Sequence, residues 1–116
     1  MITISSHGNI LYTIVSEEIT KDDFSEIEKN LDRLFNNFPK ACWYYEMQNF
    51  DGWEFKTFFH ASKYSLDHNN HFEKIAMVGE KKWQEWMTDL MKPFTSARVH
   101  FFESDDKEEA KKWIAE

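Results

Sequence analysis

The sequence is short of residues that interrupt secondary structure and of residues that cross-link a chain. Its 116 residues include 3 glycines, 2 prolines and 1 cysteine. So few breakers leave little of the chain for loops, and most of it is expected in helices and strands. Because Cys42 has no second cysteine to pair with, no disulfide can form within the chain, which is typical of a reducing compartment.

An excess of positive charge is also missing. The chain carries 14 Lys and Arg against 21 Asp and Glu, a formal net charge of −7 at pH 7. Sequence-independent binding of nucleic acid requires a cationic surface that displaces counterions from phosphates, so we expect no nucleic-acid partner. The same negative charge weakens attraction to anionic bilayers and disfavours a membrane partner.

Long hydrophobic runs are absent as well. The N-terminal stretch MITISSHGNILYTIV is apolar in places, but it has no basic leader and the polar segment SSHGN interrupts it. We therefore expect neither a signal peptide nor a transmembrane helix, and a cytoplasmic location.

What the chain has in quantity is aromatic side chains. They make up 17% of the residues, with 11 Phe and 5 Trp, which is enough to fill a substantial core or to supply an interface. The length suits one domain, and no linker, repeat or low-complexity segment divides it. The sequence therefore predicts a single domain over residues 1–116.

Strand patterns recur along the chain. Residues 1–4 and 10–16 are rich in β-branched side chains and flank Ser6-His7-Gly8-Asn9, which predicts a hairpin. Further buried strands are expected at residues 41–47, around the apolar run 75–78, and at 97–102.

Helix patterns separate these strands. Thr20 is an N-cap candidate, an apolar face follows from Phe24 to Phe38, and Pro39 ends the helix. A second helix is expected from about Trp53 to Leu66, with Asp51 as its cap. Two more are expected at residues 81–92 and after Ser104, the last with an apolar stripe of Ala110, Trp113 and Ile114.

The predicted order is β-β-α-β-α-β-α-β-α. Strands that alternate with helices imply right-handed crossovers and a mostly parallel sheet, and the opening hairpin adds an antiparallel strand. The fold class is therefore α/β, with a mixed, mostly parallel sheet covered by helices.

Residues 74–114 read KIAMVGEKKWQEWMTDLMKPFTSARVHFFESDDKEEAKKWI. This segment resembles the C-terminal half of the SpoIIAA-like family of small bacterial proteins. That family typically shows a strand-turn-helix of the form A-V-V-G-x-x-x-W, then a Pro, a strand that ends in an aromatic, and an acidic cap before A-x-x-W-(I/L). The matching positions are Ala76, Met77, Val78, Gly79, Trp83, Pro93, Phe101, Phe102, Asp105, Asp106, Ala110, Trp113 and Ile114. Phe50-Asp51-Gly52-Trp53 also resembles the central turn of the family.

This resemblance implies a βα superhelical fold akin to the anti-sigma-factor antagonists, the STAS domains and the lipid-binding CRAL-TRIO domains. In the antagonists, a phosphorylatable Ser lies at the start of the helix after the central strand. Here that region reads Asn49-Phe50-Asp51-Gly52-Trp53-Glu54 and contains no hydroxyl. The phosphorylation switch is therefore not expected in this chain.

Residues that could carry catalysis or hold a cofactor give no such pattern. A lone Gly79 followed by Glu80 has neither the several glycines nor the Gly-Lys-Ser/Thr signature of a phosphate-binding loop, and Lys81 and Lys82 after it are expected to be solvent-exposed. His68 and His71 lack the converging third ligand of a zinc site. Cys42 lies in an aromatic strand, where burial makes a thiol inert. We therefore predict no catalytic residue, no metal and no cofactor.

One helix face is the best candidate for binding. On the helix expected from Trp53, the side opposite the apolar face carries Trp53, Thr57, His60 and Tyr64. A helix that covers a sheet is usually polar there. Trp53, His60 and Tyr64 are therefore predicted to line an interface or a ligand site, most simply between two copies of the chain; the alternative is that this face is ordinary core.

Three classes of function remain open. The preferred one is a non-enzymatic binding or regulatory module that contacts a protein or an apolar small ligand. The second is a peripheral lipid-binding protein, suggested by the kinship with lipid-binding folds. The third is an enzyme with a His/Asp site that has no recognisable motif.

Overall fold

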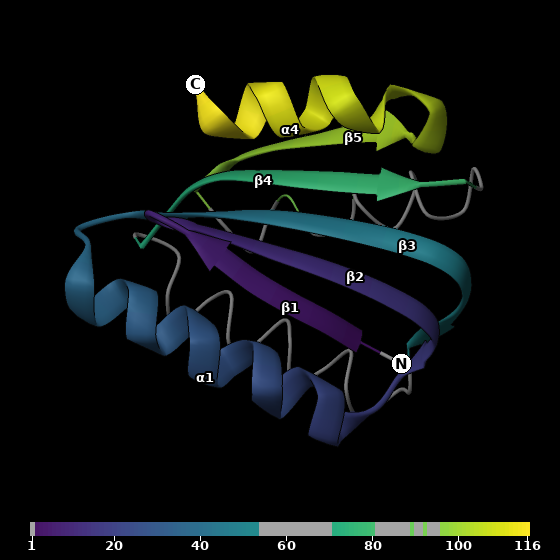
Figure 1. Ribbon diagram of the computed structural model, residues 1–116, viewed down its shortest axis with the longest axis horizontal. Helices are drawn as coiled ribbons and strands as arrows, with labels where there is room; N and C mark the ends of the chain where they lie inside the picture. Colours follow the sequence, from purple (N-terminus) through teal and green to yellow (C-terminus); the bar gives the residue numbers. More distant parts are fainter. Residues whose placement is uncertain (1, 54–70, 81–88, 90–91, 93–95) are drawn as a thin grey trace.

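Each strand of the sheet lies beside the strand that precedes it in the sequence. The computed structural model describes residues 2–53, 71–80, 89, 92 and 96–116. Within them, five strands form one sheet in the order β1-β2-β3-β4-β5 (Figure 1). These elements are β1 (Ile2–His7), β2 (Ile10–Ile19), α1 (Lys21–Asn37), β3 (Ala41–Trp53), β4 (Phe72–Gly79), β5 (Arg98–Glu103), the 3-10 turn η2 (Ser104–Asp106) and α4 (Lys107–Ala115).

The directions of the strands confirm the α/β class with a mixed sheet. β1 pairs antiparallel with β2, while β2 with β3, β3 with β4, and β4 with β5 are all parallel. Helix α1 lies on one side of the sheet and α4 on the other (Figure 1). Among the described residues, no helix is long and apolar enough to cross a membrane.

The N-terminal hairpin is confirmed, with a tighter turn than expected. His7 pairs with Ile10, so only Gly8 and Asn9 form the loop. Gly8 has a φ of 59°, the left-handed region that a glycine adopts without a side-chain clash. A glycine at the first loop position is typical of a type II′ turn, whose twist matches that of the two strands.

The first helix begins at its predicted cap. The Thr20 hydroxyl accepts a hydrogen bond from the Asp23 amide at 3.1 Å, and the Asp23 carboxylate accepts one from the Thr20 amide at 3.2 Å. This reciprocal pair satisfies two backbone donors at the helix start. The buried face of α1 consists of Phe24, Ile27, Leu31 and Leu34.

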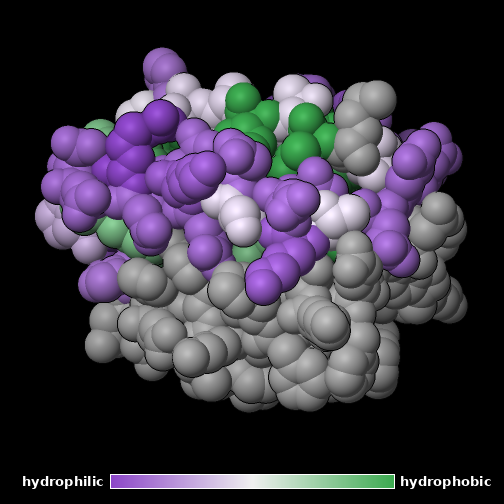
Figure 2. All heavy atoms as spheres, turned by 90° about the horizontal axis from the view of Figure 1, so that it is seen from below, coloured by the Kyte–Doolittle hydropathy of each residue, from purple (hydrophilic) through white to green (hydrophobic). Residues whose placement is uncertain are grey.

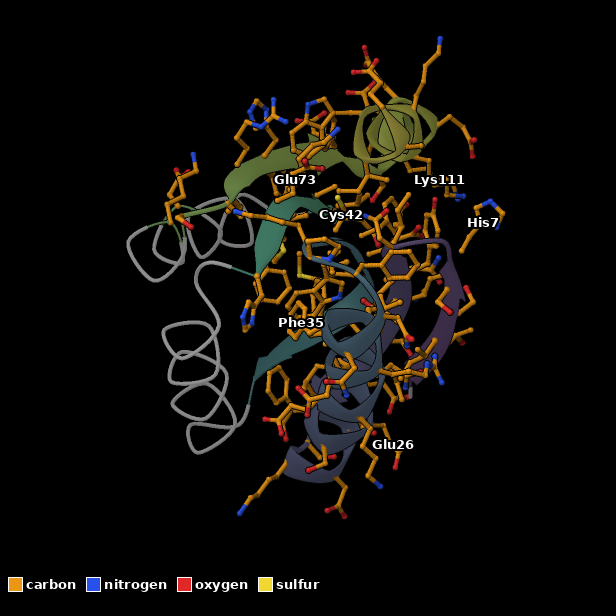
Figure 3. All side chains as sticks on the ribbon, turned by 90° about the vertical axis from the view of Figure 1, so that its left-hand side faces the viewer. His7, Glu26, Phe35, Cys42, Glu73 and Lys111 are labelled. Atoms are coloured by element: carbon orange, nitrogen blue, oxygen red, sulfur yellow. The ribbon has the colours of Figure 1, made fainter. Side chains whose placement is uncertain are left out.

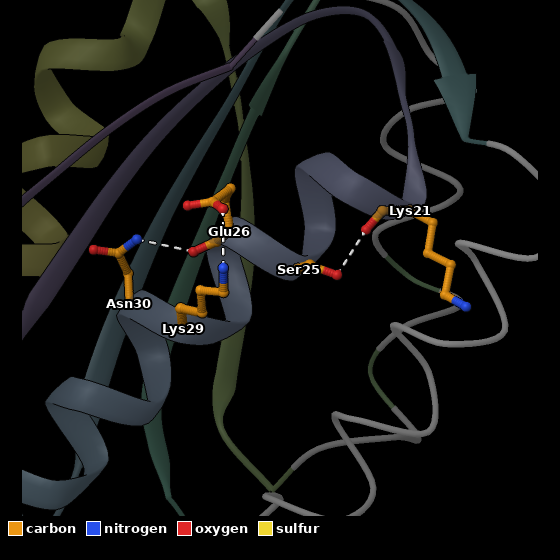
Figure 4. A network of polar contacts seen from close by, with 5 residues as sticks. All are labelled: Lys21, Ser25, Glu26, Lys29 and Asn30. Carbon is orange, nitrogen blue, oxygen red and sulfur yellow. Dashed lines mark hydrogen bonds and ion pairs between the residues drawn. The ribbon is translucent and has the colours of Figure 1, made fainter.

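The opposite face of α1 is polar and bonded along its own length. Ser25 donates to the Lys21 carbonyl at 3.1 Å, Asn30 donates to the Glu26 carbonyl at 2.8 Å, and Lys29 pairs with Glu26 at 3.2 Å (Figure 4). Among the described residues on this side of the molecule, hydrophilic ones predominate (Figure 2). The face is therefore a solvated one.

The third strand is longer than predicted, and this corrects one boundary. β3 continues from Ala41 to Trp53, so Trp53 ends a strand, and Asp51 does not cap a helix there. Register shifts on either side of Glu17 keep β2 paired as far as Ile19 with Trp53. Glu17 and Asn49 have φ values of 64° and 47°, and such bulges let two strands bend and stay paired.

A second correction concerns the start of the last helix. Ser104 begins the 3-10 turn η2 and is not the cap; Asp106 holds the cap position of α4 without a side-chain hydrogen bond. Within α4, Ala110 and Ile114 are buried as predicted and Trp113 is half-buried. The helices expected at 53–66 and 81–92 lie almost wholly outside the described residues.

Two apolar layers hold these elements together. The side chains of α1 pack with one face of the sheet, including Leu11, Val15, Trp43, Tyr45 and Ile75. On the other face, Cys42, Tyr44, Ala76 and Val78 pack with Ala110 and Ile114 of α4. The alternation along each strand sends successive side chains to the two layers.

Candidate functional site

The face of the sheet that carries α4 is covered unevenly. Helix α4 packs chiefly on β3, β4 and β5. Farther out, on β2, Tyr12, Ile14 and Ser16 are only half-buried, and Gln48 beside them on β3 is exposed. We call these four residues the open strip. Cross-strand pairing places Tyr12 beside Tyr44, Ile14 beside Glu46 and Ser16 beside Gln48.

A buried carboxylate borders the open strip. Glu46 is only 4% exposed, and both of its oxygens accept short hydrogen bonds. The Tyr44 hydroxyl donates to Oε1 at 2.6 Å, and the Gln48 side chain donates to Oε2 at 2.6 Å. The three residues are spaced by two along β3, so their side chains share one face of the sheet.

Opposing effects decide the charge of Glu46. Burial alone raises the pKa of this carboxyl, but the hydrogen bonds from Tyr44 and Gln48 and the attraction of Lys107 and Lys111 outweigh it. The pKa is lowered as a result, so Glu46 is ionised at neutral pH. Burial, together with the bond to Glu46, raises the pKa of Tyr44, so its hydroxyl keeps its proton and remains a donor.

Aromatic rings connect this carboxylate to the surface. The ring of Tyr12 lies 5.6 Å from that of Tyr44, centroid to centroid, with Tyr12 on the solvent side. The ammonium of Lys111, a residue of α4, lies 5.9 Å from the centre of the Tyr44 ring. The half-exposed Tyr12 ring thus lies over a buried carboxylate and near two lysines, an arrangement that suits binding through mixed apolar and polar contacts.

A buried lysine holds the other end of α4. Lys74 of β4 is 4% exposed, and its ammonium donates to the backbone oxygens of Trp113 at 2.9 Å and Glu116 at 2.8 Å. The same ammonium lies 5.3 Å from the centre of the Trp113 ring. A cation at the C-terminus of a helix satisfies carbonyls that have no partner within the helix. Lys74 thus fixes the C-terminal end of α4 on β4.

The single cysteine lies on the same face and is buried, as predicted. Cys42 is 2% exposed, and its thiol donates to the Glu73 carboxylate at 3.6 Å. Burial raises the pKa of the thiol, and the nearby Glu73 charge adds to the effect. Figure 3 shows Cys42 and Glu73 on the α4 side of the sheet and Phe35 on the α1 side. A protonated, enclosed thiol is a poor nucleophile.

The residues predicted for the binding stripe are not brought together by the described structure. Trp53 ends β3, and His60 and Tyr64 lie outside the described residues, so the stripe stays a prediction. Of the histidines, His7, His71 and His100 are described and lie at separate strand ends or edges. In the described part of the chain, no group of three or more His, Cys, Asp or Glu residues could hold a metal ion.

Gly79, where the sequence predicts no phosphate-binding loop, ends β4 beside an acidic hollow. The hollow has a volume of about 300 Å³ and is lined by Gly79, Glu80, Glu103, Ser104 and Asp105. Carboxylates repel phosphate, so this hollow agrees with the view that Gly79 does not serve a phosphate site.

Sequence reasoning missed the Tyr44-Glu46-Gln48 group. The segment ACWYYEM was interpreted as buried strand only, although Glu46 is a charged residue inside an apolar run. Charged residues are rarely buried without partners. The signal was the spacing by two from Tyr44 to Glu46 to Gln48, which places a donor on each side of the carboxylate.

Known proteins share this fold. A model of the SpoIIAA-like family matches residues 10–115. The solved structure of an uncharacterized protein of the DUF3478 family with a SpoIIAA-like fold, from Shewanella loihica PV-4, has a TM-score of 0.78 and 23% sequence identity, covering 98% of this chain and 92% of that one. No curated protein matches the chain.

Proposed function

Because the chain belongs to the SpoIIAA-like family, we propose that it is a non-enzymatic binding and regulatory module whose ligand is another protein, bound at the open strip. The observation that supports this most is the half-exposed Tyr12 ring, which lies on Tyr44 beside the ionised Glu46. Tyr joins an apolar body to a hydrogen-bonding tip, and it is enriched at protein interfaces for that reason.

The chemistry of the site favours binding over catalysis. Both oxygens of Glu46 are occupied by fixed donors, so the carboxylate is poorly placed to take a proton from a substrate. Tyr44 holds its proton tightly, and Cys42 is an enclosed thiol. These buried groups therefore support the half-exposed residues of the open strip and are not placed to react with a substrate.

The partner is expected to present a cationic surface with at least one apolar side chain. The chain carries a net charge of −7, which attracts and steers a basic partner. Near the open strip itself, Lys107 and Lys111 offset the negative charge of Glu46. The contact with the partner there is therefore expected to be mainly apolar, made by the Tyr12 ring and the neighbouring Ile14 side chain. Regulation at residues 49–54 would not use phosphorylation of a hydroxyl, because that segment has none.

Affinity capture with matched variants tests the proposal. The bait is the full chain as wild type, as Tyr12→Asp, or as Asn36→Asp, which adds the same charge on the exposed side of α1. We expect wild type and Asn36→Asp to capture equal amounts of one partner protein, and Tyr12→Asp to capture at least about tenfold less of it. The purified protein should then bind wild type directly in calorimetry, and circular dichroism should show that Tyr12→Asp is folded.

Three results would contradict it. The first is that no protein distinguishes Tyr12→Asp from Asn36→Asp. The second is a small apolar molecule that copurifies with wild type in native mass spectrometry and is lost with Tyr12→Asp. The third is sedimentation of wild type with liposomes, which would favour lipid binding instead.

A further inference from the structure

The two edges of the sheet differ in how they are protected against pairing. β5, at one edge, carries Arg98 and Glu103 at its ends, and Asp89 and Lys92 border its outer side. β1, at the other edge, has the sequence ITISSH, without charge and without proline, and it pairs with β2 without a bulge. Charges, prolines and bulges are the usual means by which proteins block an edge strand. Within the described structure, β1 has none of them.

The hairpin determines which backbone groups of β1 face outward. In a two-residue hairpin the residues that flank the loop form a hydrogen-bonded pair, and such pairs alternate with non-hydrogen-bonded ones. His7 with Ile10, Ser5 with Tyr12 and Thr3 with Ile14 are therefore bonded to each other. The N–H and C=O groups of Ile2, Ile4 and Ser6 consequently point away from β2, along the open edge.

Symmetry then limits how a second copy can pair with this edge. A two-fold axis perpendicular to the sheet makes β1 antiparallel to its own copy and keeps the same face of both sheets on the same side. Two residues that lie opposite each other across the dimer contact must then both point their N–H and C=O groups toward the other copy, or both point them toward their own β2. The register that uses all three outward residues places Ile4 against Ile4 of the second copy, and Ile2 against Ser6.

The side chains agree with this register. Ile2 and Ile4 are half-buried and pack against the α1-side core, so each leaves apolar surface at the edge. Hydrophobic surface is visible at one margin of the α1 side (Figure 2). In the symmetric pair, the four isoleucines of the two copies would adjoin and continue that core. On the other face, Thr3 would lie opposite Ser5, a hydroxyl pair of the kind that stabilises antiparallel strands.

We propose that β1 is a self-pairing edge, through which two copies of this chain form a dimer with one continuous sheet and Ile4 at the two-fold axis. A second copy is the partner that this register fits, because the same three residues supply the outward backbone groups on both chains. Two chains of net charge −7 repel each other, and the repulsion is smallest where the strands that meet carry no charge. This dimer is independent of the proposed function, since the open strip belongs to β2 and β3.

Sedimentation of three forms of the full chain tests the edge. Wild type is expected to shift from monomer to dimer between about 1 µM and about 1 mM. Ser6→Pro removes an outward N–H and leaves the bonds to β2 in place, so it should weaken the dimer about tenfold or more. Ser6→Ala keeps the N–H and should dimerise like wild type. Wild type that is monomeric throughout, or a dimer that a folded Ser6→Pro leaves unchanged, would overturn the proposal.

Disulfide cross-linking tests the register and does not depend on the proline variant. Opposed residues on antiparallel strands have Cβ atoms about 4.5–5.5 Å apart, and diagonal ones about 7–8 Å. Because Thr3 meets Ser5 of the second copy, an equimolar mixture of Thr3→Cys and Ser5→Cys should oxidise to a covalent dimer, while each variant alone reacts slowly. Equal rates in all three samples, or faster reaction of one variant alone, would rule out this register.

Discussion

At the scale of single residues, Glu46 shows how a charge is kept inside this fold. Its two oxygens are bound by donors from the neighbouring positions on the same strand, and two lysines attract it from α4. Hydrogen bonds to charged groups are stronger than those between neutral groups, and leaving such a group without its donors costs still more. The carboxylate therefore stabilises the junction of β3 and α4 while its donors stay in place.

We expect Glu46→Gln to destabilise the protein by about 1–3 kcal/mol at pH 7, because an amide cannot accept both hydrogen bonds as a carboxylate does. The pKa of Glu46 is lower in the folded state, so its contribution is present above the pKa of the unfolded chain and is lost as pH falls through the folded pKa. The difference between variant and wild type should thus shrink below about pH 4.

Urea unfolding at several pH values measures this difference. Glu26→Gln is the matched control, because Glu26 lies on the exposed face of α1 and its ion pair with Lys29 is solvated. Equal stability of Glu46→Gln and wild type at pH 7, or a gap that widens on acidification, would be incompatible with an ionised Glu46 in the native protein.

Cys42 provides a second prediction at this scale. Because the thiol is 2% exposed and its pKa is raised by burial, a disulfide reagent should modify the native protein at least about 100-fold more slowly than the urea-unfolded chain. The rate is followed by absorbance at pH 8. Rapid stoichiometric reaction of the native protein would show that the α4 side opens readily around β3.

At the scale of elements, the start of α1 depends on one side chain. Removing the Thr20 hydroxyl leaves the Asp23 amide without its partner, so Thr20→Ala should cost about 1 kcal/mol of unfolding free energy. Ser25→Ala, on the exposed side of the same helix, should change stability by less than about 0.5 kcal/mol. Thermal and urea unfolding report both. A Thr20→Ala variant as stable as wild type would contradict the role of the cap.

The end of α4 depends on Lys74 in a comparable way. Lys74→Met keeps the length of the buried stem and removes the bonds to the Trp113 and Glu116 oxygens. We expect amide hydrogens of α4 to exchange at least about tenfold faster in this variant, with α1 unchanged. Mass spectrometry of exchanged peptides separates the two helices. Equal acceleration in both would indicate global loss of stability.

Local patterns were enough to predict most of these elements. The hairpin follows from Gly8 and Asn9 between β-branched runs, and α1 follows from Thr20 and its apolar face. The predicted end of β3 was wrong because Asp51 and Gly52 resemble the start of a helix. In the structure, pairing with β2 beyond Glu17 keeps this part of the chain extended. The start of α4 was wrong because Ser104 can cap a helix, but the chain forms a 3-10 turn first.

The candidate site was less accessible from the sequence. Spacing by two places Tyr44, Glu46 and Gln48 on one face, but it does not say that Tyr12 from β2 and Lys111 from α4 meet them. Those contacts depend on the parallel register of β2 with β3 and on where α4 crosses the sheet. Both are tertiary features, set by residues about 30 positions or more apart along the chain.

At the scale of the whole molecule, the negative charge acts differently on the two proposed contacts. Two copies with a net charge of −7 repel each other, whereas a cationic protein is attracted. Raising the salt concentration from about 50 mM to about 500 mM shortens the screening length. The β1 dimer should then become slightly more stable, and the affinity of the open strip for its cationic partner should fall. Sedimentation and calorimetry across this range measure the two. If both affinities rose or both fell with salt, net charge would not act on the two contacts in the opposite ways proposed.

The order of the strands also bears on how the protein forms on the ribosome. Every strand of this sheet after β1 pairs with the strand that precedes it in the sequence, which has already been synthesised when the later strand emerges. The order of pairing in the sheet therefore follows the direction of translation. Among the described elements, α4 is the one that packs on the face that carries Tyr44 and Ala76, and it is made last. Until α4 has been made, the apolar surface of β3 and β4 on which it packs is the one that a ribosome-associated chaperone would have to protect.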